Sequence, residues 1–351
     1  MNTTRENSTV STFSDLILNP VLLSVLTANN WLQPTPIQAQ AIPLLLQGED
    51  MLGIAQTGTG KTLAFGIPIV NSLQDNAGNA LILVPTRELA QQVADTMQIM
   101  CRPFGMNSCL LIGGASMNMQ KQNLCKGPRI VIATPGRLLD HLKQGTIGLK
   151  NVKYLVLDEA DRMLDMGFKP QIEKILVTVP TQRQTMLFSA TMPQEIRQIT
   201  QKYMHSPATV EVAPAGTVAQ MVEQSLYIVQ SDQKKNVLAK LLDESYGPVL
   251  VFVRTKHRAS QLTKTLYKTH PVAEIHSNRS QNQRQAAIDG FRSGKYRILI
   301  ATDIAARGID VKDIQLVINY DLPDEAESYI HRIGRTGRAG SSGQAVSIAA
   351  T

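Results

Sequence analysis

Cysteine is scarce in this chain of 351 residues, with Cys101, Cys109 and Cys125 as the only three. An odd count without CxxC spacing argues against a disulfide-stapled frame and against a structural zinc site. Aromatic residues make up only 5% of the chain, and no apolar run approaches the roughly 20 residues that a membrane span needs. Residues 1–14 also lack the apolar segment of a secretory signal. We therefore expect a reduced, cytoplasmic protein that does not contact membranes.

The composition that is present fits two globular domains. A length of 351 residues exceeds that of one ordinary core, and a hydrophobic content of 43% allows large cores to be buried. The formal net charge is +7, which favours polyanionic partners without naming one.

Short apolar runs recur between longer helical patterns along the whole chain, which predicts an α/β fold with a mostly parallel sheet in each domain. The predicted strands are 51–55, 80–84, 109–112, 130–133, 154–157 and 186–188, then 249–253, 273–275, 297–301, 316–319 and 345–349. A stretch with two prolines and a glycine separates the two series and indicates a linker. The predicted organisation is a flexible 1–12, a first domain 13–207, a linker 208–220 and a second domain 221–351.

Polar clusters follow nearly every predicted strand. Since parallel sheets bind ligands beyond the carboxyl ends of their strands, this pattern predicts an extended ligand-binding face on each domain. A sheet that served only as core would not need threonine, arginine, glycine and carboxylate residues at so many strand ends.

The loop after the first strand has the composition of a phosphate-binding loop. Its glycines let backbone N–H groups approach phosphates, Lys61 balances the β/γ charge, and the Thr62 hydroxyl is a Mg²⁺ ligand. The predicted nucleotide-binding residues here are Thr57, Gly58, Thr59, Gly60, Lys61 and Thr62. A strict P-loop has glycine where this chain has Ala55, so a glycine-rich turn without ligand is the alternative from this segment alone.

Asp158 and Glu159 directly follow the apolar run 154–157. Asp158 is placed to hold the same Mg²⁺ as Thr62, and Glu159 to orient or deprotonate a water. Acidic residues at a helix start also favour the helix dipole, but that reading leaves the preceding apolar strand unexplained. Together, loop and carboxylates predict hydrolysis of a nucleoside triphosphate.

The segment 331–338, His-Arg-Ile-Gly-Arg-Thr-Gly-Arg, holds three arginines. Guanidinium groups fork onto phosphate oxygens. The segment therefore fits general RNA binding or a charged surface, or an arginine finger that the second domain delivers to a γ-phosphate.

Further phosphate-type donors lie at other strand ends in both halves. They are Arg87, Thr134, Arg137, Arg254, Thr255 and Thr302. Because no aromatic residues are interleaved with them, contacts to a nucleic-acid backbone fit better than base stacking.

These motifs resemble those of the DEAD-box RNA helicases over residues 13–349, with Asp158-Glu159-Ala160-Asp161 as the naming motif. Residues 55–62 match the family's own A-x-x-G-x-G-K-T loop. Residues 251–281 look most like the bacterial RhlE branch. The resemblance implies two tandem RecA-like domains, ATP and Mg²⁺ as cofactors, and single-stranded RNA as partner.

The resemblance also implies roles for individual residues. Gln38 would read the adenine edge, Phe13 would stack on the ring, and Asp310 would lie at the ribose. The coupling residues would be Ser189, Thr191 and His331; Arg335 and Arg338 would meet the phosphates; Gly114 would join the RNA contacts.

The function expected from the sequence is therefore an ATP-dependent RNA helicase with a monomeric core, which separates short duplexes by domain closure and is open to protein adaptors. An ATP-gated RNA clamp uses the same residues and stays an alternative. A DNA helicase shares the ATP site, whereas a metabolic P-loop ATPase would not need the arginine and threonine face.

Overall fold

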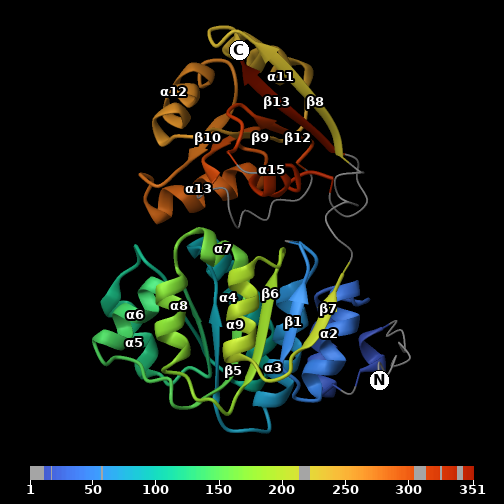
Figure 1. The fold of residues 1–351 in the computed structure, drawn as a ribbon, viewed down its shortest axis with the longest axis vertical. Helices are drawn as coiled ribbons and strands as arrows, with labels where there is room; N and C mark the ends of the chain where they lie inside the picture. The colour runs from blue at the N-terminus through green and yellow to red at the C-terminus, as the bar shows by residue number, and fades with distance from the viewer. Residues whose placement is uncertain are drawn as a thin grey trace. The chain divides into compact units, whose positions relative to one another are not determined.

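The computed structural model describes residues 12–16, 18–56, 58–212, 222–303, 314–324, 326–337 and 343–351. The chain divides into two compact units, residues 1–214 and 215–351. Each unit is an α/β layer structure with one parallel sheet (Figure 1). No helix among the described residues is long and apolar enough to span a membrane.

The first unit has a seven-stranded sheet in the order β3-β4-β2-β5-β6-β1-β7. Its strands are β1 (Met51–Ile54), β2 (Asn79–Leu83), β3 (Ser108–Leu111), β4 (Ile130–Ala133), β5 (Val152–Leu157), β6 (Gln184–Ser189) and β7 (Ala208–Glu211). Its α-helices are α1 (Pro20–Ala28), α2 (Pro36–Leu46), α3 (Lys61–Leu73), α4 (Arg87–Cys101), α5 (Met117–Cys125), α6 (Pro135–Lys143), α7 (Ala160–Asp165), α8 (Lys169–Leu176) and α9 (Gln194–Tyr203). Short 3-10 turns span Phe13–Asp15 and Arg102–Phe104.

The second unit has a six-stranded sheet in the order β10-β11-β9-β12-β13-β8. The strands are β8 (Val222–Val229), β9 (Val249–Phe252), β10 (Val272–Ile275), β11 (Ile298–Ala301), β12 (Leu316–Asn319) and β13 (Gly343–Ala350). The helices are α11 (Lys234–Glu244), α12 (Lys256–Leu266), α13 (Gln281–Arg292) and α15 (Ala326–Ile333).

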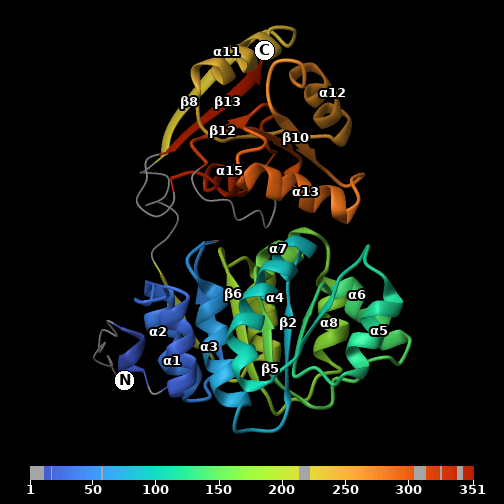
Figure 2. The same ribbon diagram turned by 180° about the vertical axis from the view of Figure 1, so that it is seen from behind.

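Alternate side chains of the first sheet pack into separate cores on its two faces. In β2, Ala80 and Ile82 belong to the core under α1–α4, whereas Leu81 and Leu83 belong to the core under α6–α9. Figure 2 shows the face that carries α1 to α4. Because both faces of a parallel sheet are covered, its strands are apolar throughout, and this is why the sequence revealed them.

All eleven predicted strands are present, and β7 and β8 were not predicted. β8 lies at the sheet edge, and most of its residues are exposed, including Leu226 and Ile228. An edge strand of this kind lacks the continuous apolar run that identifies a buried one.

β7 corrects the predicted start of the linker at 208. Residues 208–211 pair with β1, and the Val212 N–H donates to the Ile54 carbonyl at 3.0 Å. The remainder of the predicted linker, 213–220, lies outside the described residues.

Candidate functional site

The sheet of the first unit groups the predicted site residues by strand. The predicted phosphate-loop, coupling and acidic catalytic residues follow the adjacent strands β1, β6 and β5, and the predicted RNA residues follow the adjacent strands β3, β4 and β2. Since all these strands are parallel, both groups lie at the carboxyl edge of one sheet.

The glycine-lysine loop is braced from α2. The Thr35 hydroxyl donates to the Thr59 carbonyl at 2.7 Å, and Gln38 Nε2 donates to the Gly60 carbonyl at 2.9 Å. Gly60 has a left-handed φ of 91°, and a Cβ there would collide with the Gln38 amide. The loop therefore reaches the start of α3 in a fixed conformation, with the helix amino terminus available to phosphate.

Lys61 lies against the acidic motif. Its Nζ is 3.7 Å from Asp158 Oδ1 and donates to the Ala55 carbonyl at 3.2 Å, and both charged side chains are buried. The structure thus brings together the predicted phosphate-binding lysine and the predicted metal-binding carboxylate.

Glu159 adopts a left-handed backbone with φ 52° at the turn from β5 into α7. This conformation is uncommon for a residue other than glycine and marks sites where the surroundings enforce it. The Glu159 Oε2 atom forms a buried ion pair of 2.6 Å with Arg162 Nη1. Arg162 therefore fixes the position of the side chain predicted to act on water.

Three carboxylates crowd this turn, since Asp158, Glu159 and Asp161 are each at most 3% exposed. The pKa of Asp158 is raised to about 6, mainly by burial and also by the charges of Glu159 and Asp161, although Lys61 and the Glu159 N–H oppose the increase. A buried carboxylate of this kind is stabilised by a divalent cation. The hydroxyl of Thr62, the residue after Lys61, is a ligand type that Mg²⁺ accepts together with substrate phosphates. A buried carboxylate and a hydroxyl thus fit a Mg²⁺ ion that also binds substrate phosphates. Among the described residues, no three His, Cys, Asp or Glu side chains are arranged to hold a metal ion by themselves.

Replacing Asp158 with asparagine should stabilise the protein in the absence of nucleotide and Mg²⁺. The folded-state pKa of about 6 exceeds the ordinary 3.8, so the wild type loses stability as pH rises through this range. Two pKa units correspond to about 3 kcal/mol. We expect Asp158→Asn to raise the free energy of unfolding by about 1–3 kcal/mol at pH 7 and little near pH 4. Urea denaturation at both pH values measures this, and a variant less stable than wild type at pH 7 contradicts it.

Asp161 ties the acidic motif to the segment after β6. Its Oδ2 accepts hydrogen bonds from the Ala190 and Thr191 N–H groups, both at 2.9 Å, and from the Thr191 hydroxyl at 3.1 Å. Ser189 is fully buried, and its hydroxyl finds no hydrogen-bond partner among the described residues. The predicted coupling residues Ser189 and Thr191 thus lie directly against the carboxylate turn.

Other predicted nucleotide residues are only partly placed. Gln38 is 2% exposed, and its Oε1 accepts from the Thr35 N–H at 2.9 Å. Phe13 is 3% exposed within the core that contains α1 and α2. Thr57, Asp310 and Arg338 lie outside the described residues, and nothing is described for the side chain of His331. The adenine contacts of Gln38 and Phe13 stay predictions.

Arg87 and the glycine pair after β3 lie together. A Cβ at Gly113 would be 3.2 Å from Arg87 Nη2, and a Cβ at Gly114 would collide with Arg87 Nη1. Gly114 also has a left-handed φ of 78°. The absence of side chains here lets the guanidinium of Arg87 lie directly on the loop backbone.

Thr134 and Arg137 belong to the first turn of α6, where Thr134 is the N-cap residue. The Arg137 side chain is only 13% exposed. Its Nη1 donates to the Ala115 carbonyl at 3.2 Å and to Gln120 Oε1 at 3.4 Å. Arg137, which follows β4, therefore contacts the same loop as Arg87, which follows the neighbouring strand β2.

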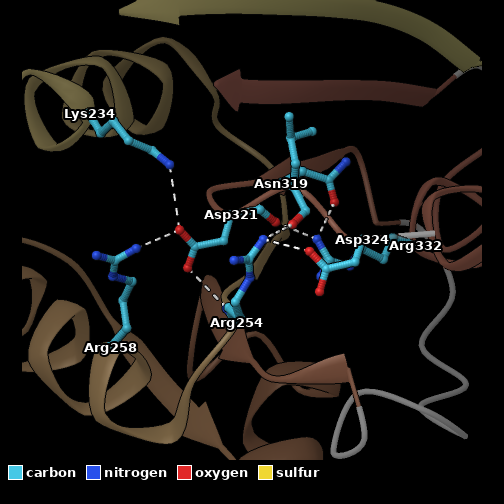
Figure 3. Close-up of polar contacts among 8 residues, drawn as sticks. Lys234, Arg254, Arg258, Asn319, Asp321, Asp324 and Arg332 are labelled. Atoms are coloured by element: carbon cyan, nitrogen blue, oxygen red, sulfur yellow. Dashed lines mark hydrogen bonds and ion pairs between the residues drawn. The ribbon is translucent and has the colours of Figure 1, made fainter. Parts of the chain in front are cut away.

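In the second unit the predicted RNA residues follow β9 and β11, and Asp321 organises the first of these segments (Figure 3). Asp321 Oδ2 accepts from the Arg254 N–H at 3.0 Å, and Oδ1 accepts from Arg258 Nη1 at 2.6 Å. Lys234 Nζ lies 3.5 Å from Oδ1, and burial lowers the pKa of Lys234, although Asp321 opposes this. The Thr255 hydroxyl caps α12 by accepting from the Arg258 N–H at 3.2 Å.

The Arg254 side chain itself is 60% exposed and donates to Asp324 Oδ1 at 2.9 Å (Figure 3). Thr302 lies at the end of β11, with its N–H 3.3 Å from the Ile275 carbonyl. At the carboxyl edge of the second sheet, Arg254 is therefore exposed and Thr302 is half-buried.

The arginines of the segment 331–338 have different environments. Arg332 is 3% exposed, and its Nε and Nη2 donate to the two Asp303 oxygens at 2.6 and 2.7 Å. Its Nη1 donates to Asn319 Oδ1 and to the Asp321 carbonyl (Figure 3). Its guanidinium also lies over the Phe252 ring. Arg335 is also buried, at 3% exposure. Its predicted phosphate contact stays a prediction.

Several residues of these sites were not identified from the sequence. They are Gln120, His141, Asp161, Arg162, Arg258, Asp303, Asp321 and Arg332. Asp161 and Arg332 lay inside motifs that had been recognised, so their position was a usable signal. Arg162 pairs with Glu159 only three positions away, at helix spacing. Asp303 and Asp321 belong to the polar clusters that follow predicted strands. Their partners, like those of Gln120, His141 and Arg258, lie far away in the sequence, and no local pattern encodes such contacts.

Comparisons with known proteins cover nearly the whole chain. A family model described as DEAD/DEAH box helicase matches residues 35–199, and one described as helicase conserved C-terminal domain matches residues 233–340. The chain is 43% identical to the ATP-dependent rRNA helicase RRP3 of Debaryomyces hansenii, over 96% of this chain and 72% of that protein. It is 44% identical to the ATP-dependent RNA helicase CshA of Listeria monocytogenes, over 96% of this chain and 65% of that protein.

A similar solved structure is that of S. cerevisiae Dbp5 bound to RNA and ADP BeF3. It has a TM-score of 0.87 and 33% identity, and the match covers 97% of this chain and 90% of the other. This likeness agrees with the two parallel-sheet units described above.

Proposed function

The chain belongs to the DEAD/DEAH box helicase family, and we propose the following mechanism for it. The chain is an ATP-dependent RNA helicase with two RecA-like domains, and it uses ATP to remodel RNA. The observation that carries this assignment is the shared sheet edge of the first unit, where the loop before α3 and the carboxylates after β5 adjoin the donors after β2, β3 and β4.

ATP hydrolysis is assigned to the residues around Asp158. Lys61, now paired with Asp158, would turn to the β/γ-phosphates when ATP binds, and the N–H groups from Gly58 to Thr62 would cradle them. Mg²⁺, held by Thr62 and Asp158 in part through water, would neutralise charge on the phosphate oxygens. Glu159, oriented by Arg162, would accept the proton of the attacking water. Arg335 and Arg338 of the second unit would complete the site at the γ-phosphate.

RNA binding is assigned to phosphate and sugar contacts from both units. The first unit would contribute Arg87, Gly114, Thr134 and Arg137, and the second unit Arg254, Thr255 and Thr302. Backbone contacts of this kind carry little sequence information, so the RNA would be bound without sequence preference. Asp161 supports coupling to ATP, because its carboxylate joins the acidic turn to Thr191.

Replacing Gln38 with alanine should remove the preference for adenine. The affinity for ATP is expected to fall about tenfold, the equivalent of one or two hydrogen bonds, while GTP, which lacks the adenine edge, is affected less. Half-saturation of the ATPase by each nucleotide measures this. In the structure Gln38 also braces the loop through Gly60, so an equal loss for ATP and GTP would contradict the adenine-reading role.

Strand displacement separates the helicase from the ATP-gated clamp. With a short RNA duplex that carries a single-stranded overhang, the helicase releases one strand in the presence of ATP and Mg²⁺. A clamp would bind RNA and hydrolyse ATP, and the duplex would stay intact. Weaker RNA binding at higher salt is expected in either case, because phosphate contacts release counterions.

Four further assignments are also part of the proposal. They are the resemblance of residues 251–281 to the RhlE branch, a cytoplasmic location, a monomeric core and the use of protein adaptors. The chain spans about two thirds of the length of RRP3 and CshA, so the activity of a whole protein of that kind is also part of the proposal.

A further inference from the structure

Helix α5 buries a glutamine where an apolar residue would be expected. Among the nine residues of the helix, the fully buried one is Gln120, at 4% exposure. A buried amide costs free energy unless each polar atom is hydrogen-bonded. Packing alone therefore does not explain why residue 120 is a glutamine.

The amide of Gln120 connects two segments of the RNA side of the sheet. Its Nε2 donates to the Ile112 carbonyl at 2.9 Å, at the start of the loop that contains Gly113 and Gly114. Its Oε1 lies 3.0 Å from Nε2 of His141 on α6. It also accepts from Arg137 Nη1 at 3.4 Å.

The direction of each hydrogen bond in this network follows from which atoms can donate a proton. Since Gln120 Oε1 can only accept, the proton of His141 lies on Nε2. His141 is fully buried, and burial followed by Arg137 and Lys121 lowers its pKa, with a smaller opposite effect of Asp140. The neutral ring then has its acceptor at Nδ1, which lies 2.8 Å from the Thr146 hydroxyl. The single proton of this hydroxyl is shared between Nδ1 and the His141 carbonyl, 3.0 Å away.

The network ends on residues assigned to RNA. Arg137 Nη1 donates to the Ala115 carbonyl at 3.2 Å, and the guanidinium of Arg87 lies on Gly113 and Gly114. The loop 112–116 is thus held at Ile112 by Gln120 and at Ala115 by Arg137, and His141 fixes the orientation of Gln120.

We propose that Gln120 and His141 are positioning residues for RNA binding, which hold the loop 112–116 and Arg137 in the geometry that receives RNA phosphates. Neither residue needs to touch RNA. The inference rests on the proposed RNA function of the first unit.

The first test is Gln120→Met, which keeps the size and apolar packing of the side chain and removes the amide. Its matched control is Gln184→Met, because Gln184 is also buried and its Nε2 donates to the Leu45 and Glu49 carbonyls, at the amino-terminal end of β6. For Gln120→Met the RNA concentration that gives half-maximal ATPase stimulation should rise tenfold or more, while the affinity for ATP stays within twofold. Gln184→Met should lower the melting temperature and leave the RNA requirement unchanged.

The second test uses His141 and remains informative if Gln120→Met does not fold. Glutamine places an amide N–H close to the position of the histidine Nε2–H, so His141→Gln should retain RNA affinity, whereas His141→Leu should lose it about tenfold. Equal RNA requirements for the two His141 variants, or a Gln120→Met variant that resembles Gln184→Met, would overturn the proposal. A wild type that RNA does not stimulate would instead refute the proposed function, so the two failures are distinguishable.

Discussion

Glu159→Gln is expected to reduce ATP turnover by about 10²–10⁴, the usual contribution of a general base, and to leave binding of ATP and RNA intact. The glutamine oxygen can still accept from Arg162 Nη1, which lies 2.6 Å from Glu159 Oε2. The left-handed turn at residue 159 is therefore expected to persist, and the variant lacks only the capacity to take a proton. Steady-state ATPase at saturating RNA, with separate binding assays for each ligand, measures the effect.

Glu195→Gln is the matched control, since Glu195 is an exposed carboxylate in the first turn of α9. It should behave as the wild type. RNA-stimulated ATPase retained by Glu159→Gln within about tenfold would remove Glu159 as the base.

Arg332→Met is expected to destabilise the second unit by about 3–5 kcal/mol, the usual cost of breaking a buried pair. The change removes both hydrogen bonds to the Asp303 carboxylate and the bonds to Asn319 Oδ1 and the Asp321 carbonyl. Arg332→Lys should recover only part of the loss, because an ammonium cannot fork onto two oxygens. Chemical denaturation followed with a probe in the second unit gives the free energy of unfolding.

Arg292→Met serves as control for the loss of an arginine. Arg292 is 40% exposed and lies 3.9 Å from Asp289, so the change should cost less than about 1 kcal/mol. A loss of ATPase in Arg332→Met with unchanged stability would contradict the structural role and assign Arg332 to the phosphates.

The sequence predicted those catalytic residues whose type and position form a recognisable local motif. Asp158 and Glu159 were identifiable because they follow an apolar strand, and Lys61 because glycines precede it in a loop. Their proximity, with Lys61 Nζ at 3.7 Å from Asp158 Oδ1, followed from the rule that parallel strands present their carboxyl ends at one edge.

Contacts between distant segments could not be predicted in this way. Gln120 and His141 are 21 positions apart, and each alone resembles an ordinary helix residue. Arg332 was grouped with Arg335 and Arg338 because they share a motif, yet the structure engages Arg332 with Asp303. The roles of such polar residues depend on their buried partners, which composition and periodicity do not reveal.

The central claim is that RNA, bound by its backbone, stimulates ATP hydrolysis at Glu159. The most direct test is the ATPase rate with single-stranded RNA and with DNA of the same length and sequence, at one fixed salt concentration. Strong stimulation by RNA and weak or no stimulation by DNA is predicted, because the proposed contacts include the sugar, and the 2′-hydroxyl is the group by which a protein tells RNA from DNA. Equal stimulation by the two, or none by RNA, would contradict the account.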